Sequence, residues 1–284
     1  MRVRSVPAIA FWLMVAGIGR AQTPNFSSKI EAVRVDVLVI DKGQPVVGLI
    51  AGDFEVFDNG VAQTVDLVSF EEIPLNVVLV LDMSDSVAGD RLDRLLTAAA
   101  SLLPALKEDD QAALVTFSQI VRLGAGLAKH RDSLRVALSE AVGSDNTALT
   151  DATYAGIVVG ESDVGRSLVI VFSDGVDTAS WLTTDAVMDV ARRSDVVVYG
   201  VSVRSPQKPD FLRDLTSTTG GRLLEVERAS NLDAIFLGVL EEFRRRYLVS
   251  YTPRGVAPSG WHRLEVRVKR NATVRARPGY LASP

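Results

Sequence analysis

Residues 76–86 read NVVLVLDMSDS, and this stretch decides the fold. Its first part, 77–81, is a run of apolar residues, as expected for a strand that is covered on both faces of a sheet. Further apolar runs occur at 112–117, 168–172 and 196–203. Segments with apolar residues at helical spacing lie among these runs, at 92–106, 134–142, 186–191, 211–215 and 232–243. The alternation predicts an α/β fold with a doubly wound, mostly parallel sheet.

The segments on either side of this region show the alternation of half-buried strands instead. Valines alternate with other residues over 33–39, and apolar and charged residues alternate over 264–268. Residues 54–57 lead into Asp58-Asn59-Gly60, a hairpin turn sequence because Asn and Gly tolerate positive φ. Neither flank is long enough to make a core alone, so we expect the two flanks to pack together into one small β module.

The N-terminus has the pattern of a secretory signal peptide. Arg2 and Arg4 precede an apolar run at 6–18, and cleavage is predicted after Ala21. The alternative is an uncleaved anchor, but this run of 13 residues is shorter than the roughly 20 that span a bilayer. The protein is therefore expected to be exported, to the periplasm or the medium, with no membrane span after cleavage. The predicted organisation is a signal peptide at 1–21, an N-terminal β segment at 22–74, the α/β domain at 75–245 and a C-terminal β segment at 246–284.

Composition excludes several kinds of chemistry. The 284 residues include no cysteine, so thiolate catalysis, zinc–thiolate sites and iron–sulfur clusters are excluded. The two histidines, His130 and His262, are interpreted as surface residues. The formal net charge is -4, although residues 243–284 carry 10 basic residues and one acidic residue. We interpret Arg244-Arg245-Arg246 as the basic end of a helix, and Arg263, Arg267 and Lys269 as the solvated face of a strand. No nucleic-acid partner is expected.

A functional site is expected at the ends of two buried strands. The first buried strand runs into Asp82, followed by Ser84 and Ser86, and the strand at 168–172 runs into Asp174. Ligands of doubly wound sheets bind beyond the carboxyl ends of the strands. If the two strands are neighbours, their carboxylates repel each other, and a divalent cation would hold both ionised. Ligands that are all oxygen favour a hard cation such as Mg²⁺ over Zn²⁺ or copper.

Four stretches together resemble the von Willebrand factor type A domain family; they are residues 77–86, 113–118, 167–175 and 196–203. The resemblance extends over 76–245 and implies a Rossmann-like fold with a metal-ion-dependent adhesion site (MIDAS). It implies that Ser84 and Ser86 ligate the metal directly, and that Asp82 and Asp174 act directly or through water.

The resemblance also implies a threonine ligand ahead of the third helix. Thr147 is the residue that aligns with the family's Gly-Gly-Thr turn, and Thr150 is the alternative. Here the sequence departs from the family pattern, because Asp145-Asn146 stands where the two glycines are usual.

In this family the metal keeps one position open, which an Asp or Glu carboxylate of a partner completes. The resemblance therefore implies a protein-binding module for adhesion or assembly, not an enzyme, with Mg²⁺ as cofactor (Mn²⁺ or Ca²⁺ as alternatives) and an acidic protein ligand as partner. The sequence does not identify the ligand, the residues that contact it, the oligomeric state or a conformational switch. The flanks resemble an exported bacterial subgroup of the family, best known from acidobacterial genomes, at 35–39, 53–56, 219–221, 247–251 and 277–280.

Two other functions compete with this interpretation. A Mg²⁺-dependent phosphatase-like hydrolase also places an Asp at the end of the first strand, but it needs a second Asp where this chain has Ser84. A purely structural component of an envelope assembly would need no metal. Trp181, in the loop after Asp174, is interpreted as an anchor of that loop in preference to a partner contact.

Overall fold

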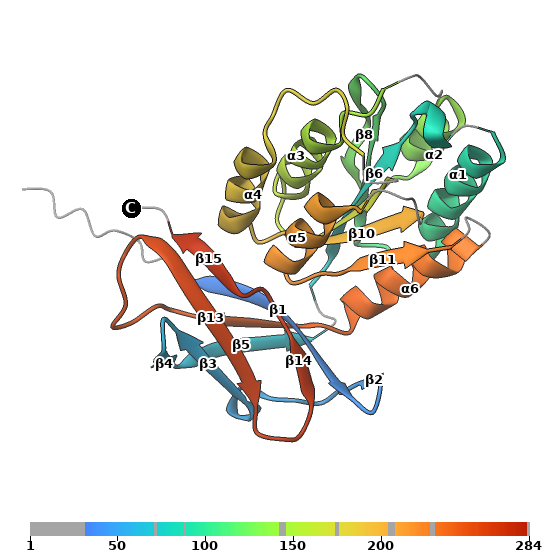
Figure 1. Cartoon of the computed structure of the whole chain (residues 1–284). Helices are drawn as coiled ribbons and strands as arrows, with labels where there is room; N and C mark the ends of the chain where they lie inside the picture. Colours follow the sequence, from blue (N-terminus) through green and yellow to red (C-terminus); the bar gives the residue numbers. More distant parts are fainter. Residues whose placement is uncertain are drawn as a thin grey trace, which may run out of the picture. The chain divides into compact units, whose positions relative to one another are not determined.

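The apolar runs in the middle of the chain form one central sheet in the computed structural model (Figure 1). Its strands lie in the order β11-β10-β9-β6-β7-β8. All neighbours are parallel except β8, which runs antiparallel to β7 at the edge. The strands are β6 (Leu75–Asp82), β7 (Gln111–Phe117), β8 (Val121–Ala128), β9 (Arg166–Phe172), β10 (Val197–Val203) and β11 (Leu223–Val226).

The structure describes residues 32–70, 73–87, 89–141, 146–173, 176–203, 208–227 and 231–282, except for the side chain of Ser86. The predicted signal peptide, 1–21, lies outside these residues. Among the residues described, no helix has the length and apolar character needed to cross a membrane.

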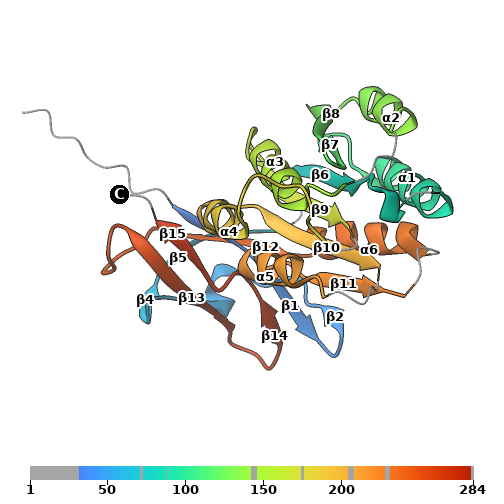
Figure 2. The same ribbon diagram turned by 45° about the horizontal axis from the view of Figure 1, so that its top comes forward.

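Helices cover both faces of the central sheet. The core on one face contains side chains of α1, α2 and α6, and the core on the other contains side chains of α3, α4 and α5. Figure 2 shows α6 and α5 on opposite sides of β10. The α/β, doubly wound sheet predicted from the sequence is therefore confirmed. The helices are α1 (Asp90–Leu102), α2 (Asp132–Ser139), α3 (Leu149–Gly160), α4 (Thr184–Arg193), α5 (Asp210–Thr218) and α6 (Leu232–Arg244), with short 3₁₀ turns η1 (Ala51–Asp53), η2 (Asp85–Val87) and η3 (Leu103–Ala105).

The flanking strands pack together around a third core, as the sequence predicts, and they form two antiparallel sheets. One sheet has the order β14-β1-β12-β5, with β2 beside β1, and the other has the order β15-β13-β3-β4. The pairing of β1 with β12 joins the two flanks, since Val33 lies opposite Tyr251. The strands are β1 (Val33–Asp41), β2 (Gln44–Pro45), β3 (Phe54–Asp58), β4 (Val61–Gln63), β5 (Val65–Phe70), β12 (Tyr247–Tyr251), β13 (Gly260–Val268), β14 (Thr273–Arg275) and β15 (Gly279–Ala282).

The turn between β3 and β4 is the predicted hairpin. Asn59 and Gly60 have φ values of 48° and 82°, in the left-handed region that Asn and Gly tolerate. The turn brings Asp58 opposite Val61 in the ladder.

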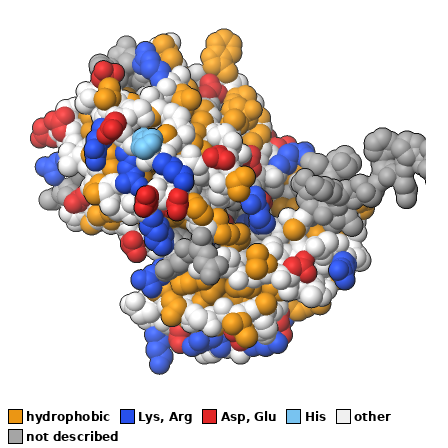
Figure 3. All heavy atoms as spheres, turned by 180° about the vertical axis from the view of Figure 1, so that it is seen from behind, with side chains coloured by type: hydrophobic (Ala, Val, Ile, Leu, Met, Phe, Trp, Pro, Cys, Tyr) orange, Lys and Arg blue, Asp and Glu red, His pale blue; other side chains and the backbone are white. Residues whose placement is uncertain are grey.

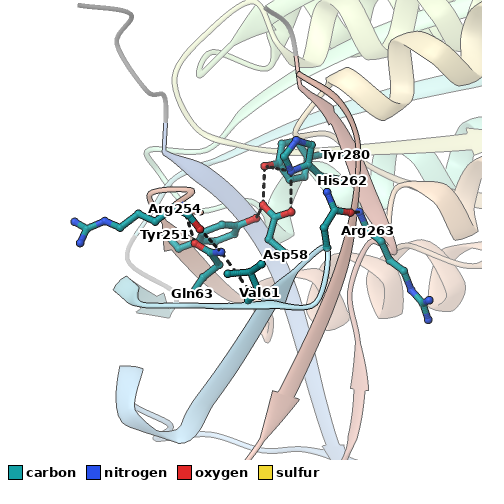
Figure 4. Close-up of polar contacts among 9 residues, drawn as sticks. Asp58, Val61, Gln63, Tyr251, Arg254, His262, Arg263 and Tyr280 are labelled. Carbon is teal, nitrogen blue, oxygen red and sulfur yellow. Dashed lines mark hydrogen bonds and ion pairs between the residues drawn. The ribbon is translucent and has the colours of Figure 1, made fainter. Parts of the chain in front are cut away.

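Asp58 is a fully buried carboxylate in this module (Figure 4). His262 of β13 contacts one of its oxygens through Nδ1 at 2.7 Å, and the hydroxyls of Tyr251 and Tyr280 donate to the other, each at 2.9 Å. The prediction that His262 lies at the surface is therefore wrong. His262 precedes Leu264 by two residues, so the alternation of β13 places both on the buried face.

Buried arginines join the β module to the central sheet at the amino ends of its strands. Arg166, the first residue of β9, donates to Asp36 of β1 through Nε at 2.9 Å and through Nη2, and both side chains are buried. Arg246, which precedes β12, is fully buried and donates to the Tyr199 hydroxyl at 2.8 Å and to the Gly220 carbonyl at 2.7 Å. Burial raises the pKa of Tyr199 to about 12, so this hydroxyl stays neutral at physiological pH.

Arg277, just before β15, makes a further contact between the module and the α/β domain. Its guanidinium donates to the carbonyls of Ala191, Arg192 and Ser194, at the carboxyl end of α4. The last carbonyls of a helix lack partners within the helix and carry partial negative charge, so a cation stabilises this end. Arg277 thereby fixes α4 to the β module.

Substitutions of Asp36 and Asp189 should distinguish the contribution of a buried ion pair to stability from that of an exposed one. Asp36→Asn leaves the Arg166 guanidinium buried without its counter-charge, so we expect the free energy of unfolding to fall by about 3 kcal/mol. Asp189→Asn removes the exposed pair with Arg192 and should change it by less than about 0.5 kcal/mol. Urea titrations measure both, and equal losses would contradict the structural role of the Asp36 contact.

The tyrosines around Asp58 should make the fold sensitive to alkali. Burial, the largest cause, raises the pKa of Tyr251 above its ordinary value of about 10. Above pH 10 the unfolded chain loses this proton while the folded chain keeps it, so stability is lost as the pH rises, by up to about 1.4 kcal/mol per pH unit. Tyr251→Phe should flatten the fall measured in urea titrations at pH 8 to 11. Tyr154→Phe, on the surface of α3, is the control and should leave the dependence of stability on pH unchanged.

Candidate metal centre

The carboxyl ends of β6, β7 and β9 meet at one edge of the central sheet. Because β6 lies between the other two, Asp82 is opposite Phe117 of β7, and Leu81 is opposite Phe172 of β9. The strand that ends in Asp82 and the strand that leads to Asp174 are therefore neighbours, the condition on which the predicted metal site depends. Asp174 itself, with residue 175, lies outside the part of the chain that the structure describes.

Asp82 is a fully buried carboxylate at this edge. One oxygen accepts the backbone N–H of Ser84 at 2.9 Å, and the other accepts the hydroxyl of Ser173 at 2.7 Å. These two donors are neutral, so they orient the carboxylate without supplying positive charge. Ser84 is buried beside it, whereas the side chain of Ser86 is outside the description.

Thr147 is brought to the same edge by backbone hydrogen bonds. The N–H of Ala148 donates at 2.7 Å to the carbonyl of Ser118, the residue that follows β7. Thr147 is 6% exposed. Its N–H donates to the Thr178 hydroxyl at 3.0 Å, and its carbonyl accepts the N–H groups of Thr178 and Ala179. Thr147 is thus held at this edge by the loop that follows β9.

Thr150, the alternative threonine, lies in the first turn of α3 and contacts a carboxylate. Its hydroxyl and its N–H both donate to Oδ2 of Asp177, the N–H at 2.8 Å. Burial alone would raise the pKa of Asp177, but hydrogen bonds from Ser180 and Thr150 outweigh it and lower this pKa below its usual value. Asp177 therefore stays ionised and caps the start of α3 from the neighbouring loop.

A second carboxylate fixes the same loop from the side of the helix. Asp151 of α3 accepts the N–H groups of Trp181 at 3.0 Å and Leu182 at 2.8 Å. Sequence reasoning identified neither Asp177 nor Asp151. The sequence around Asp177, an Asp followed by Ser180 three residues later, is a pattern that favours local turns and could have drawn attention to the loop.

The side chains at this edge suit a hard cation. Asp82, Ser84 and Thr147 offer only oxygen atoms, as Mg²⁺ and Ca²⁺ require. In the described part of the chain, no three His, Cys, Asp or Glu side chains gather in a way that could hold a metal. The family resemblance adds Ser86 and Asp174 to these ligands, and Asp174 lies outside the described residues.

Together these features define a class of protein that contains an α/β domain with an Asp-x-Ser-x-Ser sequence at the carboxyl edge of its mostly parallel sheet. A family model for the von Willebrand factor type A (VWA) domain matches residues 76–237. The chain belongs to this family, whose domains are usually non-catalytic and typically bind proteins.

Individual relatives are distant. Inter-alpha-trypsin inhibitor heavy chain H2 of Mus musculus is 24% identical over 188 residues, which are 60% of this chain and 20% of that protein. This chain thus spans about a fifth of the length of that curated relative. A von Willebrand factor type A structure from Catenulispora acidiphila matches with a TM-score of 0.56 at 10% identity, over 87% of this chain and 76% of that one.

Proximal thread matrix protein 1 from the mussel byssus matches with a TM-score of 0.55 at 15% identity, over 66% of this chain and 49% of that one. That structure was solved with zinc in its MIDAS motif. At these identities the two structural likenesses show the fold alone.

Two threonines of α3 should differ in their response to the same substitution. Thr150→Val removes the hydroxyl that donates to Asp177, and should lower the free energy of unfolding by about 1–2 kcal/mol. The buried hydroxyl of Thr153, one turn later, has no hydrogen-bond partner among the described residues. Thr153→Val should therefore be neutral or stabilising. Denaturant titrations of both variants measure the difference, and a greater loss in Thr153→Val would contradict the hydrogen-bond assignment.

Proposed function

We propose that this protein is an exported, metal-dependent protein-binding module. It captures a carboxylate of a protein ligand through Mg²⁺ in a MIDAS-type site. The residues that would hold the metal are Asp82, Ser84, Ser86, Thr147 and Asp174, with Thr150 as the alternative threonine.

One observation carries the proposal: a carboxylate is buried at the sheet edge where loops meet. The N–H of Ser84 and the hydroxyl of Ser173 donate to the two oxygens of Asp82 and orient its carboxylate at this edge. A carboxylate beside hydroxyl groups is an oxygen ligand set that suits a hard divalent cation. Ser84 lies beside Asp82, and Thr147 lies at the same edge, so both can contribute hydroxyl ligands.

The chemistry of capture follows from the cation. Mg²⁺ binds oxygen ligands in octahedral geometry and usually keeps several waters, which a ligand carboxylate can replace. The chain's own contribution is to orient Asp82 and to hold Thr147 through the loop after β9. A carboxylate bound to a partly desolvated cation forms a charge-assisted contact stronger than an exposed salt bridge.

Export and the narrower family position are further parts of the proposal. The basic and apolar N-terminal pattern supports a signal peptide with cleavage after Ala21, and hence a place in the periplasm or the medium. The β module, built from both flanks, accompanies the α/β domain as expected for the exported bacterial subgroup. We propose the domain organisation 1–21, 22–74, 75–245 and 246–284 on the same grounds.

Removing single metal ligands should weaken the binding of Mg²⁺ while leaving the fold intact. Asp82→Asn and Ser84→Ala should each weaken Mg²⁺ binding, measured by isothermal titration calorimetry on the mature chain, by a factor of at least about ten. Thr147→Val should do the same, whereas Thr150→Val should retain most of the affinity if Thr147 is the ligand.

The matched control is Asp93→Asn, which removes an exposed carboxylate from the first turn of α1. Its Mg²⁺ affinity should equal that of the wild type. Mg²⁺ at 100 times its dissociation constant should also stabilise the wild type by about 2.7 kcal/mol. A wild type that binds no divalent cation, or an Asp82→Asn variant that binds it unchanged, would refute the proposed function.

A further inference from the structure

Trp181 is the most exposed large side chain near the candidate metal centre. It is 95% exposed, so the prediction that it anchors its loop is wrong. The loop is anchored by main-chain hydrogen bonds to carboxylates instead, which leaves the indole ring free of any structural task in the loop.

The loop presents this ring on a rigid backbone. Asp177 accepts the N–H groups of Ala179 at 3.2 Å and Ser180 at 3.0 Å, and Asp151 accepts those of Trp181 and Leu182. Four successive N–H groups are therefore bound to carboxylates. A loop fixed in this way loses little conformational entropy when a partner binds, which favours affinity.

An exposed aromatic side chain of α3 lies one helical turn from the loop. Tyr154 follows Asp151 by three residues on the same helix face, and the exposed Val158 lies one turn further along the helix. Leu182 is partly exposed beside Trp181. Hydrophobic side chains stand out along the top of the molecule in Figure 3, the end at which the loop before α4 lies in Figure 1. An aromatic ring within such a patch is the usual core of a protein-binding hot spot.

The charges at this edge restrict what the partner can be. The helices that follow β6, β9, β10 and β11 begin at the carboxyl edge of the sheet, and each has an acidic first turn. Asp210 is paired with Arg213 at 2.7 Å, and the other acidic side chains disfavour a partner with many carboxylates. The acidic residues are Asp90, Asp93, Asp185, Asp210 and Asp233.

We propose that the ligand is a protein segment with a single carboxylate for the metal and a large apolar side chain that packs on Trp181. This inference rests on the proposed function and names the partner of the same site. Trp181 follows Ala179 by two residues, at most about 7 Å along the chain. The N–H of Ala179 lies 3.1 Å from the carbonyl of Thr147. An extended ligand would therefore carry its apolar residue about two to four positions from its carboxylate.

A random peptide library displayed on phage tests the proposal. The mature chain is immobilised, the library is bound in Mg²⁺, and phage are eluted with EDTA. The wild type should select peptides with one Asp or Glu, an apolar residue two to four positions away, and few other acids. Trp181→Ser should bind the best wild-type peptide about 10- to 100-fold more weakly in Mg²⁺, by calorimetry. Val164→Ser is the matched control, because Val164 is 88% exposed on the loop between α3 and β9, and it should bind like the wild type.

The outcomes separate this inference from the function on which it rests. A wild type that fails to bind Mg²⁺ overturns both. If Mg²⁺ binds but the library yields no EDTA-eluted peptides, peptides without the apolar residue, or peptides that Trp181→Ser binds as tightly, only this inference is overturned. Binding of anionic phospholipid vesicles that depends on Trp181 would overturn it in favour of a membrane contact. Concentration-dependent dimerisation that depends on Trp181 would overturn it in favour of a second copy of the chain.

Discussion

The parallel pairing of β6 with β9 is the constraint on which the rest of the structure depends. It sets Asp82 beside Ser173 and gives the central sheet two chemically different edges. At the carboxyl edge lie the helix starts, their acidic first turns and the candidate metal centre. At the amino edge, buried arginines such as Arg166 and Arg246 join the sheet to the β module. The candidate metal centre and the attachment of the module therefore lie at opposite edges of the sheet, and the helix dipoles favour the arginines at the amino edge.

The sequence predicted the features that are encoded by local patterns of apolar residues. Runs such as 77–81 and 168–172 indicated strands buried on both faces, and Asn59-Gly60 indicated a hairpin. Buried polar residues were not predicted, because their partners are distant in sequence. Arg246 reads as part of a basic tail, yet it is fully buried against Tyr199, and His262 meets Asp58 from 204 positions away.

The residues of the candidate site also divide into those that the sequence indicated and those that only the folded structure shows. The motif at Asp82 and Ser84 could be recognised because its spacing is local. Thr147 was implied only by the family resemblance, because the spacing of apolar residues did not predict α3, the helix that follows it. The roles of Asp177 and Asp151 depend on how the loop after β9 folds onto α3, which no periodicity reveals. The exposure of Trp181 has the same origin: once backbone groups and carboxylates hold the loop, its largest side chain is not required to do so.

The joining of the two flanks by β1 and β12 has a consequence for how the molecule is made. Val33 pairs with Tyr251, which emerges from the ribosome about 200 residues later. Closing so long a loop carries an entropic cost that short-range contacts avoid, so high contact order slows this step. The α/β domain can begin to fold before β12 is available to pair with β1 and β5. A newly made chain therefore passes through an interval with unpaired strands, in which a holding chaperone would protect it.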